Sequence, residues 1–127
     1  MNIIEDLERK LDQLVRMPDD PRILNDIGVL LYQLEDWKNA EMYLQRAWEL
    51  DPTNKDILYN YGLLLHLQFK LQEAVRIFEV YLELYPDDRD VVEKMGDSYY
   101  QLGECEAAAK MFNQLRGIRK EGHLIYG

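Results

Sequence analysis

Apolar residues recur at helical spacing along most of the chain, and they do so in pairs of stripes. Leu24, Ile27 and Leu31 lie three or four residues apart, which places them on one face of a helix. A second stripe follows with Leu44 and Ala47. Such a pair of stripes, separated by a short polar break, predicts two antiparallel helices.

The same pair of stripes occurs three times, and three scarce residue types mark its period. Each type recurs every 34 residues: Gly28, Gly62 and Gly96; Ala40, Ala74 and Ala108; Pro18, Pro52 and Pro86. The breaks between paired stripes are equally regular: Glu35-Asp36, Phe69-Lys70 and Gly103-Glu104. The chain is therefore predicted to repeat a helical hairpin.

The small residues have a packing role in this prediction. Glycine inside a helix costs roughly 1 kcal/mol relative to alanine, so three glycines in register indicate places where two helices approach closely. Leu44, Phe78 and Phe112 are expected to fill the space beside them. Pro52 and Pro86 should end the second helices, and the Asn or Asp that follows each can cap the next helix.

These residues resemble the tetratricopeptide-repeat (TPR) family, whose pattern is W-x2-L-G-x2-Y, then A-x3-F, then P. The three copies read Leu24-x2-Ile27-Gly28-x2-Leu31 with Ala40-x3-Leu44 and Pro52; Leu58-x2-Tyr61-Gly62-x2-Leu65 with Ala74-x3-Phe78 and Pro86; and Val92-x2-Met95-Gly96-x2-Tyr99 with Ala108-x3-Phe112. The departures are the absence of the tryptophan in every copy, Tyr81 at a position that is usually small, and Lys120 in place of the last proline.

The resemblance implies an all-α fold, a right-handed superhelical stack of antiparallel helix hairpins with about seven helices. We expect a capping helix within residues 1–19, repeats at about 20–53, 54–87 and 88–119, and a tail at 120–127. The capping helix is inferred from an apolar stripe that is about two residues out of phase with the second-helix stripes: Ile4, Leu7, Leu11, Leu14 and Val15. A coiled-coil seam is the alternative, but two heptads are too short to sustain one alone.

A candidate binding surface follows from the face of each first helix that turns away from its apolar stripe. The resemblance implies that first helices line a concave groove that binds peptides or helices of other proteins. The predicted partner-binding residues are Asn25, Val29, Tyr32, Tyr59, Leu63, His66, Leu67, Asp90, Glu93, Asp97 and Tyr100. They give the groove an apolar, aromatic centre and an acidic end, which suits a ligand with apolar anchors and a basic group. The alternative is that Val29, Leu63 and Leu67 only complete the packing between repeats.

The chemistry available in the side chains argues against an enzyme. Ser98, Thr53 and Cys105 are single representatives of their types, and there are two histidines. We interpret Cys105 as a small buried side chain. Asp90, Glu93 and Asp97 share one helix face, but acidic residues are favoured near a helix N-terminus and no metal-binding motif accompanies them. We therefore predict no catalytic residue, no metal and no cofactor.

Charge and hydropathy exclude further partners. The net charge of −9 repels nucleic-acid phosphates, and the longest uncharged run is shorter than the ~20 apolar residues that span a bilayer. The N-terminus turns acidic before an apolar stretch develops, unlike a secretory signal. The sequence thus favours a cytoplasmic protein.

The predicted function is a non-catalytic TPR adaptor or scaffold that holds a partner peptide or helix. The alternatives are a small chaperone for a secreted or assembling protein and a self-assembling scaffold. A clamp for the C-terminal carboxylate of a chaperone is rejected, because that resemblance implies basic groove residues where this chain has Glu93 and Asp97. The last hairpin has no following helix, so we expect its apolar end to be covered by the tail or, in a homo-oligomer through the C-terminal end, by a second copy.

Overall fold

A computed structural model of the protein describes residues 2–117, which form seven α-helices and no strand. The helices are α1 (Ile3–Arg16), α2 (Pro21–Gln33), α3 (Trp37–Leu50), α4 (Lys55–Leu67), α5 (Leu71–Leu84), α6 (Arg89–Gln101) and α7 (Cys105–Gly117). The predicted all-α architecture of about seven helices is confirmed. The predicted tail, 120–127, lies outside the described residues, and so does its predicted docking onto the last hairpin.

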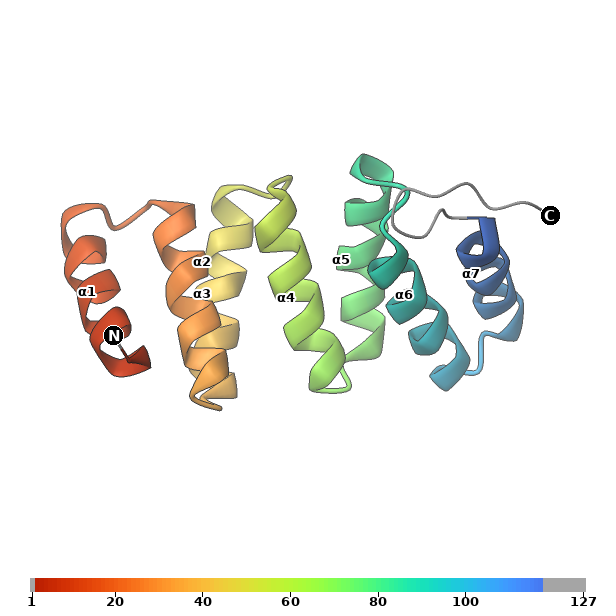
Figure 1. Cartoon of the computed structure of the whole chain (residues 1–127), viewed down its shortest axis with the longest axis horizontal. Helices are drawn as coiled ribbons and strands as arrows, with labels where there is room; N and C mark the ends of the chain where they lie inside the picture. Colours follow the sequence, from red (N-terminus) through yellow and green to blue (C-terminus); the bar gives the residue numbers. More distant parts are fainter. Residues whose placement is uncertain (1, 118–127) are drawn as a thin grey trace. The chain divides into compact units, whose positions relative to one another are not determined.

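The chain divides into two compact units, Met1–Leu64 (unit 1) and Leu65–Gly127 (unit 2), and the boundary falls near the end of α4. In unit 1, α2 and α3 pack as an antiparallel hairpin, and α1 packs against α2 (Figure 1). In unit 2, α6 and α7 form the equivalent hairpin, and α5 packs against α6 (Figure 1). The same pairing of helices thus builds each unit.

The core of unit 1 joins the first repeat to the start of the second. Leu24, Ala47 and Ile57 are buried together. Leu14 of α1 packs against this cluster, as do Tyr43 and Trp48. The amphipathic stripe of α1 therefore contributes to the core through Leu14, although none of the residues of α1 is fully buried.

Gly28 and Gly96 lie where the two helices of a hairpin approach each other closely. A Cβ atom on Gly28 would lie 2.6 Å from Cγ of Leu44, and one on Gly96 would lie 2.7 Å from Cε1 of Phe112. Both distances are shorter than carbon–carbon van der Waals contact. The predicted packing role of Gly28 and Gly96, with Leu44 and Phe112 beside them, is confirmed.

The turns that follow α2, α4 and α6 each contain one residue with a left-handed backbone. The φ angles are 61° at Glu35, 60° at Phe69 and 80° at Gly103. Only the third turn has glycine, the residue that adopts this conformation without a steric cost. The sequence breaks at these three positions correctly located the turns.

Helix ends follow the predicted signals. α3 ends at Leu50 and α5 at Leu84, two residues before Pro52 and Pro86. The Asn54 side chain accepts a hydrogen bond from the Ile57 amide at the start of α4, as expected of a cap.

The interpretation of Cys105 as a buried side chain is wrong, because Cys105 is exposed. It is the first residue of α7, and the buried stripe of this helix begins one turn later, at Ala108. A residue in the opening turn precedes the part of the helix that packs against α6.

Candidate partner-binding surface

The α2 part of the predicted surface is mostly occupied by packing within unit 1. Asn25 is 9% exposed, and its Oδ1 accepts a hydrogen bond from Nδ2 of Asn60 at 3.0 Å. This bond links α2 to α4. Val29 is half-buried. Asn25 is therefore part of the helix packing, whereas Val29 keeps some exposure.

Tyr32 forms an aromatic pair that the sequence analysis did not identify. Its ring lies edge-on to Trp37, with centroids 5.1 Å apart and planes at 81°, a favourable arrangement for two aromatic rings. Trp37 begins α3 and is 38% exposed. The period could not reveal Trp37, because the matching positions hold Leu71 and Cys105.

The α4 part of the predicted surface runs from half-buried to exposed. Tyr59, Leu63 and His66 are half-buried, and Leu67 is 43% exposed at the last position of the helix. Apolar surface on α4 is therefore most accessible at the C-terminal end, where the helix enters unit 2.

His66 is fixed against α6 by a buried hydroxyl. Its Nδ1 lies 3.1 Å from Oγ of Ser98, which is fully buried. Partial burial lowers the pKa of His66 below its ordinary value of 6.5, the positive charge of Lys94 lowers it further, and the charges of Asp97 and Asp90 oppose the shift. A neutral imidazole therefore predominates at neutral pH.

The acidic end of the predicted surface lies on α6 and is partly neutralised. Asp90, Glu93 and Asp97 are exposed. Nζ of Lys94 pairs with Oδ1 of Asp90 at 2.7 Å, whereas Glu93 and Asp97 have no ion pair among the described residues. Glu93 and Asp97 therefore provide the negative charge that is most available to a ligand.

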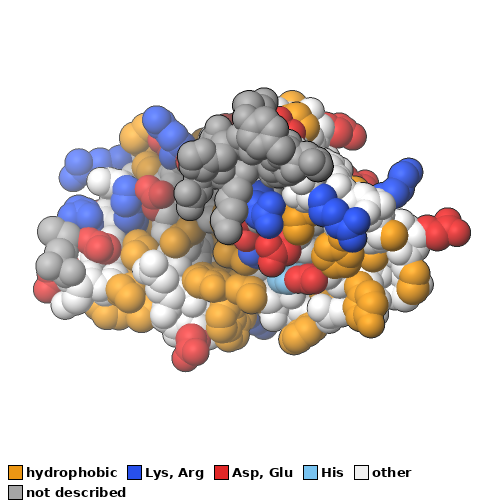
Figure 2. Space-filling view, turned by 45° about the vertical axis from the view of Figure 1, so that its right-hand side comes forward, with side chains coloured by type: hydrophobic (Ala, Val, Ile, Leu, Met, Phe, Trp, Pro, Cys, Tyr) orange, Lys and Arg blue, Asp and Glu red, His pale blue; other side chains and the backbone are white. Residues whose placement is uncertain are grey.

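Tyr100 completes the α6 face and is 68% exposed. Together with the end of α4 it defines what we call the α4–α6 surface, consisting of His66, Leu67, Asp90, Glu93, Asp97 and Tyr100. All six residues belong to unit 2. The space-filling view shows acidic and hydrophobic side chains next to each other on the face that it displays (Figure 2).

The described residues contain no candidate metal centre. In the range 2–117, no three His, Cys, Asp or Glu side chains are grouped so that they could hold a metal ion. None of the seven helices is long and apolar enough to cross a membrane.

Two models of the family described as tetratricopeptide repeat match the chain, one over residues 25–89 and the other over residues 90–117. The human cell division cycle protein 16 homolog is 25% identical over 82% of this chain. The anaphase-promoting complex subunit CDC16 of Saccharomyces cerevisiae is 28% identical over 72% of it. The chain spans only 18% and 12% of the lengths of these two relatives.

Solved structures share the arrangement of helices. MamA superposes with a TM-score of 0.82 at 24% identity, over 94% of this chain and 64% of that chain. YrrB, described as a TPR protein with an unusual peptide-binding site, gives a TM-score of 0.82 at 25% identity, over 94% of this chain and 62% of that one. These similarities place the helices of this chain in an α-solenoid fold.

Proposed function

The chain belongs to the tetratricopeptide-repeat family, and we propose on this premise that it is a non-catalytic interaction module that binds a partner peptide or helix through its first helices. The observation that carries the proposal is the α4–α6 surface. Leu67 and Tyr100 are large and exposed there, beside the carboxylates of Glu93 and Asp97.

The composition of this surface suggests the chemistry of the partner. A tyrosine offers rigid apolar area with a polar tip, and such residues dominate binding at many protein interfaces. The two free carboxylates favour a basic group on the ligand. The proposed ligand is therefore a peptide or helix with apolar anchors and at least one Lys or Arg.

The predicted groove residues of unit 1 support the same role less directly. Val29, Tyr32, Tyr59 and Leu63 are half-buried there and would offer further apolar contact. Asn25 would act indirectly, since its side chain is engaged by Asn60. The peptide-binding site named for YrrB is consistent with a ligand in a structure of this kind.

Affinity capture with matched variants tests the proposal. Leu67→Ala combined with Tyr100→Ala removes the exposed apolar anchors of the α4–α6 surface. Leu84→Ala is the matched control, because Leu84 is 45% exposed on the second helix α5. Proteins retained by the parent chain and the control, but lost from the double variant, would support binding at this surface. Equal capture by all three chains would reject it.

A further inference from the structure

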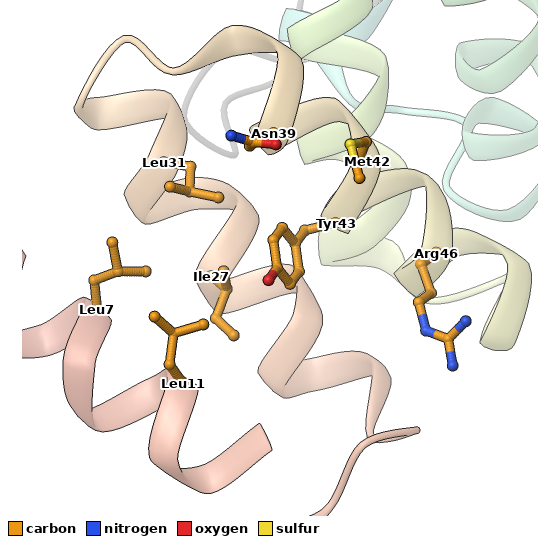
Figure 3. A pocket seen from close by; sticks show the side chains of 8 residues that line it. All are labelled: Leu7, Leu11, Ile27, Leu31, Asn39, Met42, Tyr43 and Arg46. Atoms are coloured by element: carbon orange, nitrogen blue, oxygen red, sulfur yellow. The ribbon is translucent and has the colours of Figure 1, made fainter. Parts of the chain in front are cut away.

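Unit 1 has an apolar pocket on a different face from the first-helix surface. The pocket has a volume of about 350 Å³ and lies between α1 and α3, over α2 (Figure 3). Its apolar lining consists of Leu7, Leu11, Ile27, Leu31, Met42 and Tyr43. Ile27 and Leu31 form the part of the lining that belongs to α2, whereas the predicted groove uses Val29 and Tyr32 on the same helix.

Unit 2 has a pocket at the equivalent place, and the comparison shows what is unusual in unit 1. Five lining positions of the unit 1 pocket recur two repeat lengths later: Leu11, Ile27, Leu31, Tyr43 and Arg46 correspond to Glu79, Met95, Tyr99, Met111 and Gln114. In unit 2, Oη of Tyr99 donates a hydrogen bond to Oε1 of Glu79 at 3.1 Å. This bond bridges α5 and α6.

The corresponding pair in unit 1 is Leu31 and Leu11, so the polar bridge is replaced by two apolar side chains. Leu11 is 38% exposed, and Met42 across the pocket is 59% exposed. Exposed apolar side chains that line a concave surface mark a contact site more often than a scattered leucine does. Unit 1 therefore has a partly exposed apolar surface at a position where unit 2 has a polar contact.

Unit 1 as a whole carries a net negative charge, and two of its exposed carboxylates lie on α1 close to Leu11. Unit 1 contains seven Lys and Arg residues against thirteen Asp and Glu residues. Arg46, the charged residue of the lining, already pairs with Asp19 at 2.6 Å. Glu8 and Asp12, which flank Leu11 on α1, are exposed and have no ion pair among the described residues.

We propose that this pocket docks an amphipathic helix of a partner protein whose large apolar side chains are flanked by Lys or Arg. The apolar side chains enter between Leu11 and Met42, and the basic side chains face Glu8 and Asp12. A second copy of unit 1 fits poorly because it would bring the same acidic residues together. The pocket is a second surface beyond the proposed groove, so one chain can hold two ligands at once.

The probe is a labelled amphipathic peptide of about 14 residues, roughly four helical turns, with leucines at i, i+3, i+4 and i+7 spacing and lysines elsewhere. A peptide with glutamates in place of the lysines is the matched control ligand. We expect the lysine peptide to bind the full chain by fluorescence anisotropy and the glutamate peptide to bind at least about tenfold more weakly. Amide chemical-shift changes are expected at Leu7, Leu31 and Tyr43.

Variants locate the contact. Leu11→Gln with Met42→Gln keeps good helix formers at exposed positions and is expected to weaken lysine-peptide binding about tenfold or more. Leu50→Gln is the control, because Leu50 is 42% exposed on α3 outside the pocket. Glu8→Gln with Asp12→Asn should weaken binding several-fold and reduce its dependence on salt.

The following results would overturn the proposal. Absence of lysine-peptide binding, or binding that the Leu11 and Met42 changes leave intact, would reject the pocket. If Leu67→Ala with Tyr100→Ala alone abolished binding, the peptide would use the α4–α6 surface, and the proposed function would stand without a second site. A concentration-dependent mass that the Leu11 and Met42 changes abolish would make a second copy the occupant. Much tighter peptide binding by a chain ending at Gly117 would assign the pocket to the chain's own residues 118–127.

Discussion

Tyr81 of α5 donates a hydrogen bond from its Oη to Oδ2 of Asp88, at 2.5 Å. The other carboxylate oxygen of Asp88 accepts from the Val91 amide at 3.2 Å and so caps α6. One carboxylate therefore satisfies both a buried tyrosine and the start of the next helix. The family usually has a small residue at the position of Tyr81. The hydrogen bond to Asp88 gives the larger tyrosine a structural role.

Replacing Tyr81 with Phe should lower the free energy of unfolding by about 1 kcal/mol, because one hydrogen bond is lost while the ring stays buried. Asp88→Ala should cost about 2 kcal/mol, since it removes the cap of α6 and leaves the tyrosine hydroxyl without this acceptor. Urea unfolding followed by circular dichroism measures both. The double variant should lose less unfolding free energy than the sum of the two single losses, because both changes remove the same hydrogen bond. Full additivity would show that Tyr81 and Asp88 are not energetically coupled.

Gly28→Ala and Gly96→Ala should each destabilise the chain by about 1–3 kcal/mol, because the new methyl group overlaps Leu44 or Phe112. The gain in helix propensity, up to about 1 kcal/mol, offsets part of this cost. Gly117→Ala is the control, since a Cβ there would meet no atom within 4 Å. If thermal unfolding showed that Gly117→Ala lowers stability as much as the other two substitutions, close packing at Gly28 and Gly96 would not explain their effect.

The turns between helices allow us to predict substitutions that stabilise the chain. Glu35 and Phe69 have left-handed φ angles of 61° and 60°, which cost a non-glycine residue roughly 1–2 kcal/mol. Glu35→Gly or Phe69→Gly should therefore raise the free energy of unfolding by up to about 1 kcal/mol, after the greater entropy of glycine in the unfolded chain is included. Phe69 is 75% exposed and loses little packing.

Gly103→Ala should show the reverse effect at the matching turn, a loss of about 1 kcal/mol, because φ is 80° there and alanine is strained. Denaturant midpoints of the three variants, measured side by side, test the pair of expectations. A loss of stability in both glycine substitutions would mean that the Glu35 and Phe69 side chains make contacts that outweigh the backbone strain.

The repeat period predicted the helices and the contact of Gly28 with Leu44, because both recur in every hairpin and are local in sequence. It could not predict contacts that occur once. Asn25 bonds Asn60 inside unit 1, yet the positions matching Asn25 hold Tyr59 and Glu93, so no repeated signal marks the pair.

The pairing of Lys94 with Asp90 illustrates the same limit for the candidate site. Charge along α6 predicted an acidic surface, but which carboxylates remain available depends on how one flexible side chain folds back along the helix. The apolar pocket of unit 1 could not be predicted either. It lies between three helices, and the repeat pattern does not indicate how far apart they pack.

His66 provides a prediction about pH. Its pKa in the folded chain lies below the ordinary value of 6.5, because burial and Lys94 disfavour the charged ring. As the pH falls below about 6.5, the unfolded chain binds a proton at this residue before the folded chain does. The stability that His66 contributes is therefore complete above about pH 6.5 and is lost as the pH falls through the folded pKa.

We expect the free energy of unfolding of the parent chain to fall more steeply between pH 7 and pH 5 than that of His66→Gln, which has no titrating ring at this position. Lys94→Gln should raise the pKa of His66 in the folded chain, so stability would be lost over a narrower pH range. Asp97→Asn should lower this pKa and widen that range, because the two charges act on the ring in opposite directions. Proton NMR titration of the His66 ring gives the pKa directly, and its absence from the His66→Gln spectrum separates it from His123. A folded pKa at or above 6.5, or parallel stability curves for the parent and His66→Gln, would show that burial against Ser98 does not penalise the protonated ring.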